Sequence, residues 1–291
     1  MSLAENDPHS RIEILAKLYW RSKGSDIIGI TGPPGCGKST LIAQLAKQFR
    51  AAGHSVGVVA VDPSSQVTGG ALLGDRIRMA DLAGDPEVFI RSMATRGYFG
   101  GIARATEDAV RILAATSSDR VIVETAGAGQ SDVDVKTLAD TTVVVTAPGL
   151  GDEIQALKAG IMEIGDIFVV NKADRDNADQ AAQEIYSMIT MGGPINGWVP
   201  RVVKTVATTG DGVMVLSEAI NQHADHMRKS TLTPDKVEKA RRELLAAAQR
   251  YFEDITLQEM ESSARFKKAV NRIAGRHIDP YTAASLLVEE R

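Results

Sequence analysis

The segment from Gly32 to Thr40 constrains the fold of this chain more than any other. It reads Gly-Pro-Pro-Gly-Cys-Gly-Lys-Ser-Thr and matches the phosphate-loop pattern G-x-x-x-x-G-K-[ST]. The apolar, β-branched run Ile27–Thr31 precedes this segment, and a helical pattern begins at Lys38. Because a strand, a glycine-rich loop and a helix in this order form a cradle for phosphate, the sequence predicts a nucleotide site here.

Strand and helix patterns alternate along most of the chain, which predicts an α/β fold with a mostly parallel sheet and helices on both faces. The expected strands are Ile27–Thr31, Val56–Val61, Val88–Met93, Arg120–Glu124, Thr142–Thr146, Ile167–Asn171 and Val202–Lys204. The expected helices are Lys38–Ala52, Ile102–Ala115, Asp152–Glu163, Asp179–Met191 and Val213–His226. In such folds ligands bind at the carboxyl ends of the strands, which is where the motifs of this chain lie.

Three regions follow from these patterns. Residues 1–25 hold a short amphipathic helix, residues 26–228 form the nucleotide-binding domain, and residues 229–291 form a strand-free helical tail. Helices are expected in the tail at Lys236–Ser262, Phe266–Ala274 and Tyr281–Glu290. A helical tail of this length serves either as a docking or dimerisation arm or as a cover on its own domain.

Composition excludes several classes of protein. The 291 residues carry a net charge of −4, which argues against a surface for nucleic acid. Since no run of about 18 apolar residues is present, no membrane span is expected. The polar amino terminus and the single cysteine, Cys36, indicate a cytoplasmic protein in a reducing compartment.

The phosphate loop supplies several predicted contacts to the nucleotide. These contacts are Gly35, Cys36, Gly37, Lys38, Ser39 and Thr40. Lys38 brings a positive charge to the outer phosphates and is expected to act in catalysis, while the hydroxyl of Ser39 is a ligand for Mg²⁺. The thiol of Cys36 lies at a variable position of the pattern, so no redox role is expected for it.

A second motif, Asn171-Lys172-Ala173-Asp174, follows the expected strand Ile167–Asn171 and predicts guanine specificity. The carboxylate of Asp174 can accept hydrogen bonds from N1–H and the 2-amino group of guanine. Adenine offers neither donor, so a strict site rejects ATP by about 10⁴-fold. The stem of Lys172 can cover the base, and Asn171 can tie this loop to the phosphate loop.

Acidic residues follow two further strands. Glu124 ends the run Arg120–Glu124, where its carboxylate can reach Mg²⁺ or the waters around it, and the N–H of Gly127 can reach the γ-phosphate. Asp62 ends the run Val56–Val61, and Asp75 follows in Gly74-Asp75-Arg76. The alternative for Asp62 and Asp75 is a role as a helix cap or a turn residue.

Four further segments resemble those of one known protein family. They are Val-Asp-Pro-Ser-Ser (61–65), Leu-Gly-Asp-Arg-Ile-Arg-Met (73–79), Glu-Thr-Ala-Gly-Ala-Gly-Gln-Ser-Asp (124–132) and Pro-Gly-Leu-Gly-Asp-Glu-Ile-Gln-Ala-Leu-Lys-Ala-Gly-Ile-Met-Glu-Ile (148–164). With them the chain resembles the MeaB/ArgK/MMAA family of SIMIBI-type P-loop GTPases. Members of that family act as chaperones of adenosylcobalamin-dependent acyl-CoA mutases such as methylmalonyl-CoA mutase. The resemblance covers roughly residues 25–228.

The resemblance implies a role for each matching position. Mg²⁺ would be surrounded by Ser39, Asp62, Asp75 and Glu124. Residues 62–78, 124–132 and 149–164 would be switch segments, the last of them facing the mutase. Hydrolysis of GTP to GDP would involve Lys38, Glu124 and Gln130, with Gln155 and Lys158 serving partner-stimulated hydrolysis. The loop Thr205-Val206-Ala207 would contact guanine through the backbone of Ala207, and the protein would be a homodimer.

Three other functions share the phosphate loop. A GTPase that delivers nickel would need a cluster of Cys and His, but this chain has one Cys, and His223 and His226 are expected to be solvated. A protein-targeting GTPase would need a groove rich in Met, whereas the nine Met residues are scattered. A small-molecule kinase would have no use for the motif at 171–174.

Overall fold

The computed structural model describes residues 8–19, 24–62, 79–82, 84–94, 104–116, 118–125, 131–150, 163–195, 197–229 and 234–289. The chain divides into two compact units. One contains residues 13–231, and the other contains residues 2–12 together with residues 232–291.

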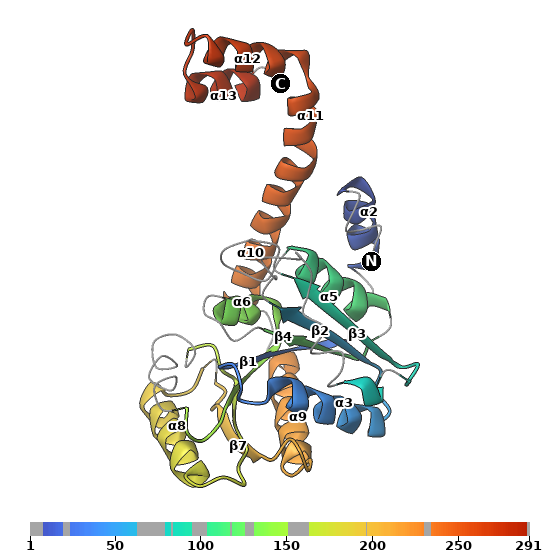
Figure 1. The fold of residues 1–291 in the computed structure, drawn as a ribbon, viewed down its shortest axis with the longest axis vertical. Helices are drawn as coiled ribbons and strands as arrows, with labels where there is room; N and C mark the ends of the chain where they lie inside the picture. Colours follow the sequence, from blue (N-terminus) through green and yellow to red (C-terminus); the bar gives the residue numbers. More distant parts are fainter. Residues whose placement is uncertain are drawn as a thin grey trace. The chain divides into compact units, whose positions relative to one another are not determined.

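The first unit is built on a seven-stranded parallel sheet with the order β3-β2-β4-β1-β5-β6-β7 (Figure 1). Its strands are β1 (Asp26–Thr31), β2 (Val56–Asp62), β3 (Val88–Ala94), β4 (Arg120–Glu124), β5 (Thr141–Thr146), β6 (Ile167–Asn171) and β7 (Arg201–Thr205). All seven strands predicted from the sequence are confirmed. The order places β1 in the centre, so the phosphate loop that follows β1 leaves the sheet between β4 and β5.

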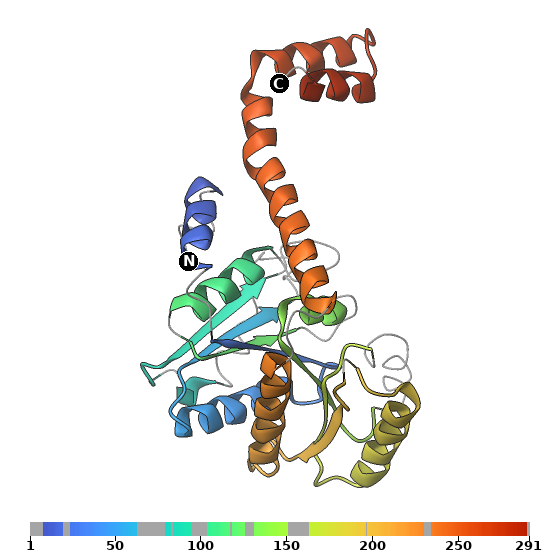
Figure 2. The same ribbon diagram turned by 180° about the vertical axis from the view of Figure 1, so that it is seen from behind.

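Helices cover both faces of this sheet (Figures 1 and 2). They are α3 (Lys38–Ala51), α5 (Arg104–Thr116), α6 (Ser131–Leu138), α8 (Ala178–Gly192) and α9 (Val213–Lys229), with a short 3-10 turn, η1 (Ala80–Leu82). The helices α3 and α9 share one apolar core with the sheet, whereas α5, α6 and α8 pack on the opposite face. The predicted α/β fold is therefore confirmed, although the expected helix 152–163 lies outside the described residues apart from Glu163, which is in a turn.

The strands are apolar on both sides because each face is covered. In β5, Val143 and Val145 pack into the core beneath α3 and α9, and Val144 between them packs into the core beneath α8. This alternation follows from the two-residue period of a strand. Burying each such side chain contributes about 1.5–3 kcal/mol to folding, so the continuous apolar runs fix the centre of the sheet.

The helix α6 was not among the helices that the sequence predicts. Its sequence, Ser-Asp-Val-Asp-Val-Lys-Thr-Leu, alternates polar and apolar residues as a strand would, so its period does not indicate a helix. Gly29 in β1 makes room for it: a Cβ atom there would lie 2.5 Å from Cγ2 of Val135 and 3.0 Å from Cβ of Ala139. The helical conformation of α6 is therefore determined by tertiary packing against Gly29 and not by its local sequence pattern.

The carboxyl-terminal half of α9 is bound to the amino ends of the strands. Arg228 pairs with Asp26 at 2.5 Å, and Asp26 also pairs with Arg120. His223 is only 2% exposed, and its Nδ1 lies 2.8 Å from Oγ1 of Thr141. The expectation that His223 is solvated is therefore wrong, because this position continues the buried stripe of α9 that includes Leu216 and Ile220. His226 is half-buried beside the ring of Trp198.

The described part of residues 232–291 is helical, as predicted for the tail. Its elements are α10 (Pro234–Tyr251), a π-helical segment η2 (Phe252–Leu257), α11 (Gln258–Ser262), α12 (Ala264–Ala274) and α13 (Pro280–Glu289). Ser263 caps α12 by accepting a hydrogen bond from the N–H of Phe266, and Asp279 caps α13 by accepting from the N–H of Thr282. Near the other end of the chain lies α2 (Pro8–Leu18). None of the helices in the described ranges combines the length and apolar character that crossing a membrane requires.

Candidate functional site

The phosphate loop connects β1 to α3, as the sequence predicts, and its glycines are required by the backbone. Gly32, Gly35 and Gly37 have φ of 139°, 78° and 96°, values that favour glycine. A Cβ atom on Gly32 would lie 1.9 Å from the carbonyl oxygen of Val145, and one on Gly37 would lie 2.5 Å from Nδ2 of Asn171. The loop is therefore closely enclosed by β5 on one side and by the motif after β6 on the other.

Lys38 lies inside this loop. It is 7% exposed, and its Nζ donates hydrogen bonds to the carbonyl oxygens of Gly32 at 2.7 Å and of Pro33 at 3.2 Å. A buried ammonium needs such partners, since an unpaired buried charge is costly. The amino terminus of α3 begins at the same residue and adds its positive dipole, so the loop presents a positive site suited to phosphate.

Ser39 and Glu124 bring two oxygens together beside the phosphate loop. The hydroxyl of Ser39 donates to Oε1 of Glu124 at 2.8 Å, and both residues are buried. The register between β1 and β4 explains the contact, because Ile30 and Glu124 are paired directly before the two loops. A hydroxyl and a carboxylate are hard oxygen donors that fit Mg²⁺, so these two predicted metal ligands are compatible with that ion.

The remaining predicted ligands and switch residues are less fully described. Asp62 ends β2, two residues beyond the pair formed by Ala60 and Glu124, which brings its backbone to the same edge of the sheet. Five predicted residues lie outside the described ranges: Asp75, Gly127, Gln130, Gln155 and Lys158.

The start of the predicted switch segment 124–132 is fixed to β1. The hydroxyl of Thr125 donates to Oγ1 of Thr31 at 2.9 Å, and the N–H of Thr125 donates to the carbonyl oxygen of Ile30 at 3.1 Å. Thr31 directly precedes the phosphate loop, and Thr125 directly precedes residues 126–130. These bonds give the two loops a common anchor at the carboxyl edge of the sheet.

Asn171 connects three loops at this edge. Its Nδ2 donates to the carbonyl oxygen of Cys36 at 2.8 Å, which is the tie to the phosphate loop that the sequence predicts. Its Oδ1 accepts from the N–H of Ala207 at 3.0 Å and from Oγ1 of Thr205 at 3.1 Å. Asn171 is 1% exposed, so all of these bonds are shielded from water.

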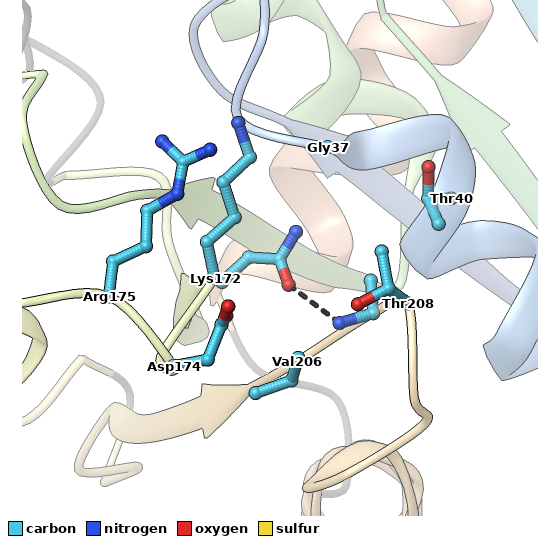
Figure 3. A pocket seen from close by; sticks show the side chains of 9 residues that line it. Gly37, Thr40, Lys172, Asp174, Arg175, Val206 and Thr208 are labelled. Atoms are coloured by element: carbon cyan, nitrogen blue, oxygen red, sulfur yellow. Dashed lines mark hydrogen bonds between the residues drawn. The ribbon is translucent and has the colours of Figure 1, made fainter.

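Lys172 crosses from the base-side motif to the phosphate loop. It has a φ of 57°, and its Nζ donates to the carbonyl oxygen of Gly35 at 2.6 Å. Its aliphatic stem therefore spans the space between the two loops, as expected for a side chain that covers a base. Figure 3 shows this stem rising from the motif toward the loop of Gly37, with Asp174 beside its lower end.

A pocket opens between these loops, and predicted and unpredicted residues share its lining. The lining consists of Gly37, Thr40, Asn171, Lys172, Asp174, Arg175, Val206, Ala207 and Thr208. Asp174 is exposed toward this space, as a carboxylate that reads a base must be. Arg175 and Thr208 were not predicted, and the only signal in the sequence is their position directly after residues of the two motifs.

Cys36 contributes its backbone to the site and not its thiol. The side chain is fully buried, and burial raises the pKa of the thiol above its usual range. A thiol with a raised pKa forms little thiolate and reacts slowly, which agrees with the expectation that Cys36 has no redox role.

The fold and this site define a class of protein. A phosphate loop follows the central strand of a parallel sheet, and a pocket carrying an Asn-Lys-x-Asp motif lies two strands away, bonded to the loop through Asn171. These features define a P-loop nucleotide-binding protein with a motif for guanine. The chain belongs to the MeaB family: the model described as "Methylmalonyl Co-A mutase-associated GTPase MeaB" matches residues 1–263. It is thus a GTPase that binds guanine nucleotides.

Two of the following three related proteins are named as GTPases. A candidate GTPase of Pyrococcus abyssi is 45% identical over 296 residues, which cover 100% of this chain and 90% of the relative. GTPase ArgK of Escherichia coli is 38% identical over 197 residues, covering 66% of this chain and 60% of ArgK. The mouse mitochondrial methylmalonic aciduria type A homolog is 35% identical over 207 residues, covering 70% of this chain and 50% of that protein.

Solved structures show the same fold. The crystal structure of an LAO/AO transport system kinase superposes with a TM-score of 0.65 at 23% identity, covering 96% of this chain and 85% of that one. The hydrogenase maturation factor HypB from Archaeoglobus fulgidus superposes with a TM-score of 0.53 at 16% identity, covering 74% of this chain and 98% of HypB. At these identities the likeness concerns the fold alone.

Proposed function

We propose that this GTPase protects an adenosylcobalamin-dependent acyl-CoA mutase and licenses the loading of its cofactor. The observation that carries the proposal is the match of residues 1–263 to a family described as mutase-associated. The name of the mouse relative, a methylmalonic aciduria type A homolog, points to the same metabolism. Methylmalonyl-CoA mutase or a mutase of related substrate is the proposed partner.

The described residues support a division of tasks during hydrolysis of GTP. Transfer of a phosphoryl group to water needs neutralised phosphate oxygens and a positioned nucleophile. Lys38 and the backbone N–H groups of residues 35–37 would hold the β- and γ-phosphates, while Asp174 would fix the base. Outside the described residues, the N–H of Gly127 is proposed to contact the γ-phosphate and Gln130 to orient water.

Ser39 and Glu124 would hold Mg²⁺, with Asp62 and Asp75 as further proposed ligands. Bound there, the ion would neutralise negative charge that develops on the phosphate in the reaction. The hydroxyl of Ser39 could bind the ion through an oxygen lone pair and still donate its hydrogen to Glu124, so the observed hydrogen bond is compatible with a bound metal.

Control by the partner is proposed to act through residues 149–164. Gln155 and Lys158 would reach the site of hydrolysis only when the mutase positions this segment, which would make hydrolysis slow in the isolated protein. Linkage then requires reciprocity: if the mutase prefers the form bound to GTP, then GTP strengthens binding of the mutase by the same factor.

Co-purification tests the partner. The tagged protein is mixed with purified adenosylcobalamin-dependent mutases of different acyl-CoA specificity, in the presence of GDP, a non-hydrolysable GTP analogue, or neither. We expect one mutase to be retained, with an affinity that differs at least about fivefold between the two nucleotides. Retention of none of the mutases under any condition would contradict the proposal.

A variant with altered base preference provides the control. In Asp174→Asn, retention of the mutase should respond to xanthosine nucleotides and no longer to guanosine nucleotides. The control shows that the response arises in this protein and not in the mutase preparation.

We also propose that the protein is a homodimer joined through its helical tail. Apolar side chains are exposed along the described tail: Leu244 is 71% exposed, Tyr251 54% and Tyr281 88%. Such side chains favour burial against a second surface. Light scattering during size exclusion should give twice the 31.1 kDa of one chain, and the mass of a single chain at about 10 µM would contradict the dimer.

A further inference from the structure

Arg175 lines the base pocket but has no part in the function proposed above. It belongs to the same lining as Lys172 and Asp174, which come from the same short segment of chain. Figure 3 shows the side chains of Arg175 and Lys172 extending from this segment in the same direction, toward the loop that carries Gly37. The pocket therefore has a second cation next to the residue that reads the base.

The backbone holds Arg175 in this position. Its N–H donates to the carbonyl oxygen of Lys172 at 3.0 Å, which closes a tight turn over residues 172–175. The N–H of Ala173 donates to the carbonyl oxygen of Thr205 at 3.0 Å and fastens the turn to β7. Because the turn is fixed at both points, the Cα of Arg175 has a defined position relative to Asn171. Its side chain therefore extends from a defined point on the wall of the pocket.

Two lysines near Arg175 have polar partners in the structure, which distinguishes them from Arg175. Lys204 pairs with Asp179 at 2.5 Å, and Lys172 donates to the carbonyl oxygen of Gly35. In the part of the chain that the structure describes, the side chain of Arg175 has no hydrogen bond and no ion pair, and it is exposed. Its charge and its plane are thus available to a molecule that enters the pocket.

The chemistry of the guanidinium group indicates what it contacts. The phosphates of a nucleotide belong at residues 32–40, and Asp174 takes the polar edge of the base, which leaves the flat face of the purine to its neighbours. A guanidinium is planar and weakly hydrated, and it stacks on aromatic rings. We propose that Arg175 stacks on the purine and, together with the stem of Lys172, forms one wall of the base slot.

This inference rests on the placement of guanine beside Asp174 and does not depend on the mutase. Stacking acts on the ring and not on the phosphates, so Arg175 should strengthen the binding of GDP and GTP by the same factor. Stacking of the planar guanidinium on an aromatic face at an exposed site corresponds to about a two- to fivefold change in affinity.

Calorimetric titration of the full-length protein with GDP and with GTP, in the presence of Mg²⁺, tests the inference. Arg175→Ala should weaken both nucleotides about two- to fivefold. Arg175→Tyr, which keeps a planar group without the charge, should restore most of the loss. Asp176→Asn is the matched control, because this exposed neighbour does not line the pocket, and it should bind as the unchanged protein does.

Two results would overturn the role of Arg175. One is an affinity of Arg175→Ala for GDP equal to that of the unchanged protein, and the other is an Arg175→Tyr variant that binds as weakly as Arg175→Ala. The variant Asp174→Asn distinguishes failure of the stacking role of Arg175 from failure of the proposed base site. If Asp174→Asn weakens GDP while Arg175→Ala does not, only the stacking role fails; if neither change affects GDP, the base site fails as well.

Discussion

Asn171 donates a hydrogen bond from Nδ2 to the carbonyl oxygen of Cys36 at 2.8 Å, and this bond joins the base pocket to the phosphate loop. The same side chain holds the loop after β7 through the N–H of Ala207. The loops proposed to bind the two ends of the nucleotide therefore share one buried residue. We expect binding at one end to favour the arrangement that the other end needs.

Replacement of Asn171 tests this connection. Asn171→Ala removes three hydrogen bonds and leaves the carbonyl of Cys36 and the N–H of Ala207 without this partner. We expect the free energy of unfolding to fall by about 2–4 kcal/mol and the Kd for GDP to rise at least about tenfold. Urea denaturation without nucleotide and calorimetry with GDP measure the two effects. Gln180→Ala, at an exposed site on α8, should change neither, and an unaltered Kd in Asn171→Ala would contradict the account.

We expect the base preference to depend on the carboxylate of Asp174. Asp174→Asn replaces two acceptors with one acceptor and one donor, which suits the 2-oxo group of xanthine better than the 2-amino group of guanine. We expect the affinity for GTP to fall by at least about 10²-fold and the affinity for xanthosine triphosphate to rise. Competition between the two nucleotides measures the change. Equal affinity for GTP in both proteins would show that Asp174 does not read the base.

Gly32 is required by a close contact as well as by its backbone angle. Gly32 and Gly53 both have positive φ, but a Cβ on Gly32 would lie 1.9 Å from the carbonyl oxygen of Val145, whereas a Cβ on Gly53 would meet no atom within 4 Å. Gly53→Ala should cost about 1–2 kcal/mol of stability. Gly32→Ala should cost clearly more and abolish nucleotide binding, because β5 or the loop must move. Equal losses in urea denaturation would refute the contact.

The buried His223 predicts a dependence of stability on pH. Burial lowers the pKa of His223, although Asp166 opposes this shift. In the unfolded chain its pKa is about 6.5, so below that pH the unfolded state binds a proton that the folded state does not. The free energy of unfolding should therefore decrease as the pH falls from 7.5 to 5.5, and it should decrease less in His223→Gln. The exposed neighbour variant Gln222→Ala should behave as the unchanged protein, and an equal pH dependence in His223→Gln would contradict the prediction.

Much of the fold follows from local sequence. Runs such as Val143–Val145 are apolar at every position, so they indicate strands covered on both faces whatever their neighbours are. The helix α6 does not follow in this way, because it depends on the space above Gly29, which lies about 100 residues earlier in the chain. The burial of His223 was missed although its spacing from Leu216 and Ile220 fits the period of a helix, and its partner Thr141 belongs to another element.

The site was predictable where a motif fixes the role of a residue. Lys38, Ser39 and Asn171 have positions set by the strand ends, and the structure brings them to one edge of the sheet. Thr208 and Arg175 belong to no motif, and their place at the site depends on the register of β6 with β7 and on the turn after Lys172. The position of such residues at the site can be recognised only from the three-dimensional structure, in which the strands lie side by side.

We infer that one site binds the phosphates through Lys38 and reads guanine through Asp174. Calorimetry with GDP, GTP and ATP, with Mg²⁺ and after its removal by a chelator, measures both properties. We predict binding of GDP and GTP that is strengthened by Mg²⁺, with ATP at least about 10³-fold weaker. Absence of Mg²⁺-dependent binding of either guanine nucleotide, or stronger binding of ATP than of GTP, would contradict the account.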